Sequence, residues 1–191
     1  MSPNCITFRR FIVATAFVGA QYAAAQDIRD GLIHNTRGIS AVPVRSEPKE
    51  SIGTFTGMSN QIFKPQGPGP FPAVVLVHTC GGIDQAGHMR THGQEMLSAG
   101  YVVFMLDSFG PRGIRNCRSP VTPSSFGALD AYAALEYLDS LPFVEKKRIF
   151  QAGYSWGGVV ASFLASPQSS EVWKSKLRFR ATVANYSPCS V

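Results

Sequence analysis

The sequence is poor in the features that mark disordered, membrane-spanning and metal-binding chains. Only 16% of its 191 residues are charged and 45% are hydrophobic, a balance that argues against disorder and favours one folded domain. The apolar run near its N-terminus has ten residues, whereas a membrane-spanning helix needs roughly 20. Neither a Cys-x-x-Cys nor a His-Glu-x-x-His motif is present, and His88 and His92 lack a third ligand, so we interpret them as surface histidines. No metal or other cofactor is predicted.

The chain also lacks the signs of a nucleic-acid-binding protein. Its formal net charge is +6, and the densest basic stretch is KSKLRFR, residues 174–180. No aromatic platform or helix-turn-helix pattern accompanies this stretch. We therefore interpret it as a solvated helix end that runs into a strand, rather than as a phosphate-binding face.

The N-terminus has the three parts of a secretory signal peptide. Arg9 and Arg10 precede the apolar run FIVATAFVGA, and QYAAA then offers an Ala-x-Ala cleavage pattern before Gln26. Residues 1–25 are therefore predicted to be removed. The mature protein is expected to be exported, to the periplasm or out of the cell, without a stable membrane anchor.

Three cysteines follow the predicted cleavage site, namely Cys80, Cys117 and Cys189. Exported proteins form disulfides readily, so we expect one disulfide and one free thiol. The sequence leaves all three pairings open.

Strand and helix patterns alternate along the rest of the chain. Residues 26–50 are polar and are predicted to be a leader outside the core, and residues 51–63 suggest an early strand or hairpin that ends at a loop rich in proline and glycine. Buried strands and amphipathic helices then alternate: strands at 73–78, 101–106, 148–152 and 180–187, and helices at about 89–99, within 126–141 and from about 155. Residues 51–191 are thus predicted to form an α/β domain, a mostly parallel sheet with helices on both faces.

The motif Gly153-x-Ser155-x-Gly157 lies between the predicted strand 148–152 and the helix after it. A sharp strand-to-helix turn of this kind lifts a serine hydroxyl clear of the sheet, and the two glycines permit its backbone angles. The helix N-terminus directs free N–H groups at a developing anion. The pattern predicts Ser155 as a nucleophile, against the alternative of a small residue in a tight turn.

Four segments, taken in order and at their intervals, resemble the dienelactone hydrolase family of α/β-hydrolases: FPAVVLVHTCGG, GYVVFMLDSFGPRG, ALDAYAALEYLDSLPFVEKKRI and AGYSWGG. The resemblance covers about residues 60–190. It implies an esterase or lactonase that acts on a small ester or lactone through an acyl-enzyme, with Ser155 as nucleophile. It also implies that Arg112 binds a substrate carboxylate.

The glycine-rich turn TCGG, at the same sheet edge, matches the loop that supplies the second oxyanion N–H in this fold. The predicted donors are the backbone amides of Cys80 and Trp156. Whether the Cys80 side chain is incidental, disulfide-bonded or a buried thiol stays open. Ser155 stands where dienelactone-cleaving members use cysteine, and Thr79 replaces their glutamate, so the chain resembles a serine branch whose substrate is unassigned.

The usual partners of a serine nucleophile are missing from the C-terminal part of the chain. In this fold the acid and then the histidine follow the serine, yet residues 156–191 contain no histidine and no aspartate, and Glu171 is their only acid. The resemblance places both partners after a seventh and an eighth strand. We therefore expect an incomplete α/β-hydrolase domain, truncated before those strands, with an exposed edge at residues 180–187 and weak or no activity.

Two alternatives remain. The chain is a degenerate hydrolase fold that binds a ligand without turnover, or it is a working enzyme with an unusual base. His78, at the end of strand 73–78, is the first residue to consider as that base, ahead of His88 or His92, although in related sequences a histidine there shapes the oxyanion loop. Asp107 is expected to bind the backbone of its own loop.

Overall fold

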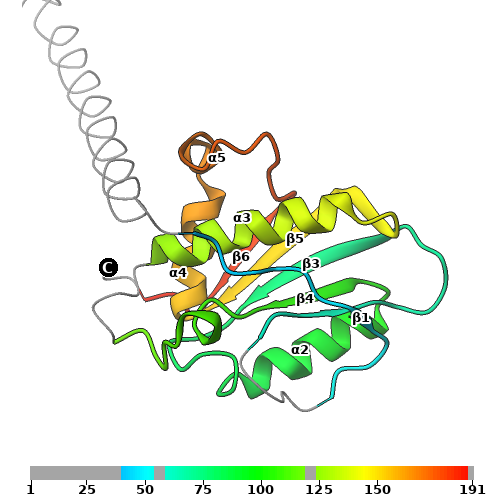
Figure 1. Ribbon diagram of the computed structural model, residues 1–191, viewed down its shortest axis with the longest axis horizontal. Helices are drawn as coiled ribbons and strands as arrows, with labels where there is room; N and C mark the ends of the chain where they lie inside the picture. Colours follow the sequence, from blue (N-terminus) through cyan, green and yellow to red (C-terminus); the bar gives the residue numbers. More distant parts are fainter. Residues whose placement is uncertain (1–39, 54–58, 119–123, 189–191) are drawn as a thin grey trace, which may run out of the picture. The chain divides into compact units, whose positions relative to one another are not determined.

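The computed structural model describes residues 40–53, 59–118 and 124–188 (Figure 1). All of these fall within one compact unit, Gly38–Val191. The predicted signal peptide, residues 26–39 of the predicted leader, and Cys189 lie outside the described residues.

A six-stranded sheet forms the centre of this unit, with the strand order β1-β2-β4-β3-β5-β6 (Figure 1). Strand β2 runs antiparallel to β4, and every other neighbouring pair is parallel. The predicted mostly parallel sheet is thus confirmed. The strands are β1 Pro48–Lys49, β2 Gln61–Phe63, β3 Phe71–Val77, β4 Val102–Leu106, β5 Val144–Tyr154 and β6 Thr182–Asn185.

Helices cover both faces of the sheet, as Figure 1 shows for α2 on one side and α3 on the other. Helix α2 ends in a Schellman motif, in which Gly100 has a φ of +86° and the N–H of Tyr101 bonds to the carbonyl of Met96 at 3.0 Å. This end agrees with the predicted helix at about 89–99. The helices are α2 Gly87–Ser98, the short 3₁₀ helix η1 Gly110–Arg112, α3 Ser124–Ser140, α4 Trp156–Ala165 and α5 Pro167–Val172.

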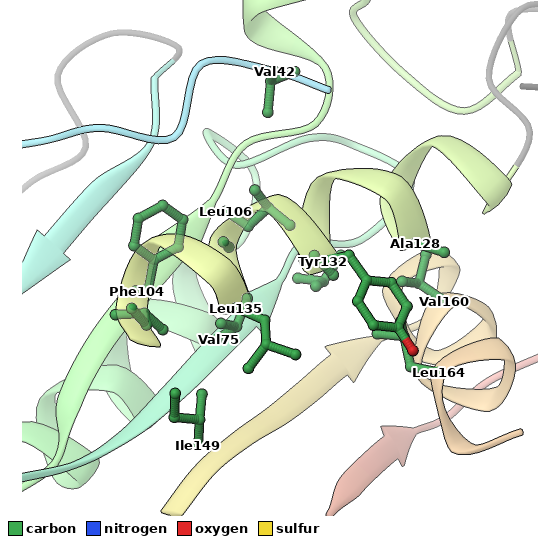
Figure 2. Packing of buried hydrophobic residues seen from close by; sticks show 14 of the residues in the cluster. Val42, Val75, Phe104, Leu106, Ala128, Tyr132, Leu135, Ile149, Val160 and Leu164 are labelled. Atoms are coloured by element: carbon green, nitrogen blue, oxygen red, sulfur yellow. The ribbon is translucent and has the colours of Figure 1, made fainter. Parts of the chain in front are cut away.

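The alternation of side chains along β3 explains its continuous apolar run. Val74 and Leu76 pack with the α2 side, whereas Val75 and Val77 pack with the α3 and α4 side. A strand buried on both faces needs apolar residues at every position. Figure 2 shows the larger of the two cores, which joins the sheet to α3 and α4 through Val75, Phe104, Leu135, Ile149, Val160 and Leu164.

The structure differs from the predicted leader at its C-terminal end. Val42 is buried in the larger core, and its N–H donates to Oδ1 of Asp130 at 2.9 Å. Pro48–Lys49 pairs with β2. Residues 40–50 contain too few apolar side chains to signal this role, which is decided by hydrogen bonds to residues far along the chain.

Candidate active site

Ser155 lies in the turn between β5 and α4, with backbone angles of φ 52° and ψ −108°. This is a strained conformation for any residue with a side chain. The turn is tied down from both sides, since the N–H of Ser155 donates to the carbonyl of Asn185 on β6 at 3.0 Å, and its own carbonyl accepts from Gly158 and Val159. The surrounding structure therefore holds Ser155 in the position typical of a nucleophile elbow.

The two glycines of the motif are required by close packing. A Cβ atom at Gly153 would overlap the carbonyl of Gly157, and a Cβ atom at Gly157 would overlap the carbonyl of Val77 at the end of β3. Neither neighbour can move, because both are backbone atoms in regular elements. This close approach brings the start of α4 against the end of β3.

The turn after β3 lies beside the elbow. The N–H of Gly157 donates to the carbonyl of His78 at 3.2 Å, which joins α4 to the segment 78–82. Within the described part of the chain, the backbone N–H groups of Cys80 and Trp156 have no hydrogen-bond acceptor. Both predicted oxyanion donors are thus unengaged.

His78 has a structural environment rather than that of a general base. Its ring is fully buried, its Nε2 accepts from the N–H of Ser108 at 3.2 Å, and its Nδ1 therefore carries the hydrogen that is donated to the carbonyl of Thr79 at 2.7 Å. Burial lowers the pKa of His78, and this outweighs the opposing effects of the Thr79 carbonyl and of Asp107. With both nitrogens bonded to backbone, the ring shapes the loop and has no free atom for Ser155.

Asp107 binds its own loop. Its Oδ1 accepts from the N–H groups of Phe109 at 3.1 Å and Gly110 at 2.9 Å, and its own N–H donates to Oδ1 of Asn60 at 2.7 Å. The predicted structural role of Asp107 is confirmed.

Arg112 is engaged by protein groups. Its guanidinium forms a bidentate pair with Asp130, with N–O distances of 2.6 Å and 2.8 Å, and it also donates to the carbonyls of Ser108 and Ser40. Asp130 is fully buried. Because both terminal nitrogens of the guanidinium are engaged by protein oxygens, the structure does not favour the predicted binding of a substrate anion by Arg112.

A disulfide joins Cys80 to Cys117, with the Cα atoms 4.7 Å apart. This settles two of the alternatives that the sequence leaves open, the pairing and the state of the Cys80 side chain. The disulfide connects the turn after β3 to the loop after β4.

His88 and His92 are half-buried and bonded to tyrosines, which differs from the simple surface position predicted. Nδ1 of His92 lies 2.8 Å from the hydroxyl of Tyr154, and Nε2 of His88 lies 2.8 Å from the hydroxyl of Tyr186. Burial raises the pKa of Tyr154 to about 12 and lowers that of His88. Among the described residues, no group of three His, Cys, Asp or Glu side chains could hold a metal.

No side chain in the described ranges hydrogen-bonds to the hydroxyl of Ser155. Glu171, the only acid after it in the sequence, is exposed on α5. The described residues thus contain the strained turn at Ser155 and the free N–H groups of Cys80 and Trp156. They contain no base that is hydrogen-bonded to the Ser155 hydroxyl.

The family model of the dienelactone hydrolase family matches residues 58–179, well over half of the chain. The chain belongs to this family. Its α/β-hydrolase fold is the one that the sequence resemblance implies, so that prediction is confirmed. No curated protein matches the sequence significantly.

The chain is similar in fold to two solved structures. A putative dienelactone hydrolase from Klebsiella pneumoniae subsp. pneumoniae MGH 78578 is 17% identical, with a TM-score of 0.53, and the match covers 78% of this chain and 58% of that one. Est1E from Butyrivibrio proteoclasticus, solved with ferulic acid bound, is 17% identical, with a TM-score of 0.51 and coverage of 66% and 47%. At this identity the likeness concerns the fold, and this family member spans about half the length of these relatives.

The sequence prediction missed two residues that hold the site in place. The sequence does indicate a role for Asp130. An acid on the apolar face of α3, next to Ala131 and Ala134, needs a buried partner. Asn60 gave no such signal. It joins the N-terminal segment to the β4 loop, since its Nδ2 donates to the carbonyl of Pro43 at 2.6 Å.

Proposed function

We propose that this member of the dienelactone hydrolase family is a serine hydrolase for small carboxylic esters or lactones. The observation that carries the proposal is the strained backbone of Ser155, at φ 52°, in a turn whose flanking glycines admit no side chain. Strain that the surrounding structure maintains is typical of functional residues.

In this proposal Ser155 Oγ attacks the carbonyl carbon of the ester while its proton passes to a general base. The oxygen of the tetrahedral intermediate accepts hydrogen bonds from the backbone N–H groups of Cys80 and Trp156, which have no other acceptor among the described residues. The C–O bond then breaks, the alkoxide takes up the proton, and an acyl-enzyme forms at Ser155. Water hydrolyses the acyl-enzyme by the same steps and regenerates the hydroxyl.

The general base and its acid are to be sought outside the described residues, because His78 is bonded to backbone through both ring nitrogens. We therefore propose that the 191-residue chain turns over esters weakly, with slow reaction at Ser155. Coding sequence after Val191 that supplies an aspartate and a histidine would support a longer active form. A stop codon at that point in authenticated DNA would oppose it.

Export to the periplasm or out of the cell is also proposed. The support is the signal-peptide pattern of residues 1–25, together with the Cys80–Cys117 disulfide, since disulfides persist in oxidising compartments. No helix within the described residues is both long enough and apolar enough to cross a bilayer. We propose no nucleic-acid partner.

One observation favours a second candidate function, the binding of a small ester or acid without turnover. The hydroxyl of Ser155 has no hydrogen-bond partner among the described side chains, so none of these side chains activates it. Turnover requires a base that activates this hydroxyl, whereas binding does not.

The deciding experiment treats the full chain with a fluorophosphonate–rhodamine probe, which labels an activated serine. The proposal predicts slow labelling of the unmutated chain and of Ser98→Ala, which removes an exposed hydroxyl on α2, and none of Ser155→Ala. Labelling that survives Ser155→Ala would refute Ser155 as the nucleophile. A folded chain that is not labelled but binds a p-nitrophenyl ester would favour the second function.

A further inference from the structure

Two loops at the carboxyl edge of the sheet are joined covalently. The turn 78–82 follows β3 and contains Cys80, one of the two proposed oxyanion donors, and the loop 107–118 follows β4 and contains Cys117. The described residues contain this disulfide next to the elbow, and the hydrolysis proposed above makes no use of the sulfur atoms themselves. Its place suggests a role in setting the geometry of the turn.

The peptide between Thr79 and Cys80 has a fixed orientation. Its carbonyl accepts from Nδ1 of His78 at 2.7 Å and from the N–H of Gly82 at 3.1 Å. In a trans peptide the N–H points opposite to the carbonyl, so the N–H of Cys80 is directed away from these two donors. That leaves it available to a substrate oxygen.

Cys80 is held on its other side by Cys117. The N–H of Cys117 donates to the carbonyl of Cys80 at 2.9 Å, and the disulfide fixes the side chain. The next two residues are glycines, and Gly82 has a φ of +82°. Consecutive glycines leave a turn with large conformational freedom, so the orientation of the Cys80 N–H depends on these outside contacts.

The loop that carries Cys117 is itself anchored. Asp107 accepts from the N–H groups of Phe109 and Gly110, and the guanidinium of Arg112 is bonded in a bidentate manner to the buried carboxylate of Asp130. A covalent bond to this loop therefore restrains the turn against a fixed part of the fold.

We propose that Cys117 is a positioning residue for hydrolysis, which acts through its disulfide with Cys80 to hold the Cys80 N–H toward the developing oxyanion. This inference rests on the proposed function, because it needs Ser155 as the nucleophile. The disulfide is then expected to affect the rate constant of the chemical step and not the affinity for substrate, because the Cys80 N–H donates to the oxyanion in the transition state.

The experiment uses the full chain with Cys5 and Cys189 replaced by serine, so that the disulfide cannot exchange with other thiols. In this background Cys117→Ser and Cys117→Ala are compared with the intact disulfide, under conditions where circular dichroism shows all three folded. The rate constant of Ser155 labelling at saturating fluorophosphonate is expected to fall at least about tenfold, because loss of one oxyanion donor costs roughly 10²–10³ in rate. The half-saturating probe concentration is expected to stay within about twofold.

A second measurement avoids substitution. A phosphine reductant and one water molecule convert the disulfide to two thiols, and the phosphine is oxidised to the phosphine oxide with the oxygen of the water. The labelling rate should fall on reduction and return on reoxidation. Hydrogen exchange of the amides in residues 79–82 should speed up while that of residues 153–158 stays unchanged.

The outcomes separate the two proposals. Labelling that is equally fast without the disulfide overturns the positioning role and leaves the nucleophile intact. If the intact chain is not labelled at all, the proposed function fails, and hydrogen exchange then decides the positioning role. Faster exchange at residues 79–82 on reduction supports the positioning role of Cys117, and unchanged exchange overturns that role.

Discussion

The imidazole of His78 and the indole of Trp156 lie nearly parallel, 11° apart, with their centroids 5.3 Å from each other. One residue directly follows β3 and the other begins α4, so this stack lies where the two halves of the candidate oxyanion hole meet. Phe109 closes the group, with its ring 4.4 Å from that of His78. The two aromatic rings help to bury the imidazole of His78, and this burial favours its neutral form.

The buried neutral state of His78 predicts a loss of stability in mild acid. Because burial lowers the pKa of His78 below 6.5 in the folded state, the unfolded chain binds the proton more readily. The free energy of unfolding should therefore fall as the pH drops below 6.5, with a slope of up to about 1.4 kcal/mol per pH unit. Urea denaturation between pH 7.5 and 5 measures it, and His78→Gln should reduce the slope.

His88 provides the control for this measurement. Its pKa is also lowered by burial, but it is only half-buried, so His88→Gln should change the slope less than His78→Gln does. Equal slopes in the unmutated chain and in His78→Gln would contradict the neutral, desolvated state of His78.

The pair between Arg112 and Asp130 predicts an effect on stability that a substrate-binding arginine would not have. Arg112→Ala leaves the buried carboxylate of Asp130 without its cation, and we expect a loss of about 3–5 kcal/mol in the free energy of unfolding. The matched control is Arg148→Ala, which breaks an exposed pair with Glu145 and should cost less than about 1 kcal/mol. A stable Arg112→Ala with altered substrate affinity would instead restore the anion-binding role.

These contacts show how far the sequence could be interpreted. The strands and helices around Ser155 follow from local periodicity, and the positions of Gly153 and Gly157 follow from the turn that they permit. The disulfide between Cys80 and Cys117 depends on two loops that meet only because β3 and β4 are neighbours in the sheet. Such partners are set by strand order, which local patterns do not encode.

The pairing of Arg112 cannot be predicted for the same reason, although the sequence does indicate that Asp130 needs a buried partner. Asp130 lies 18 residues after Arg112 in the sequence, and Ser40 lies 72 residues before Arg112. A loop arginine at a position that resembles the family's suggests a functional role, whereas its neighbours in space decide whether its donors are free. The described fold engages them with protein oxygens.

The elbow glycines predict a graded response to an added methyl group. Gly153→Ala would place its Cβ against the backbone carbonyl of Gly157, and we expect it to prevent folding or to cost more than about 4 kcal/mol. Gly87→Ala is the control, because a Cβ there meets nothing within 4 Å. Its free energy of unfolding should be unchanged or raised by up to about 1 kcal/mol. Similar stability for the two variants would contradict the close approach at the elbow.

The strain at Ser155 predicts that removing its Cβ stabilises the fold. Ser155→Gly relieves the cost of a φ of 52° and should raise the free energy of unfolding by about 1 kcal/mol while abolishing fluorophosphonate labelling. Ser155→Ala keeps the Cβ and should leave stability nearly unchanged. If glycine stabilises no more than alanine does in urea denaturation, the backbone of Ser155 is not strained.

The free edge of β6 predicts self-association of the purified chain. In the described sheet β6 pairs with β5 alone. Val183 within β6 is 52% exposed, and Tyr186 directly after it is 62% exposed. An unpaired strand edge with exposed apolar side chains is a template for pairing with another chain, and a lysine on such an edge opposes that pairing. At each concentration, Val183→Lys should therefore show a larger fraction of monomer in sedimentation velocity than the unmutated chain does. Thr91→Lys, which adds the same charge to an exposed site on α2, should not, and equal association by both variants would place the contact elsewhere.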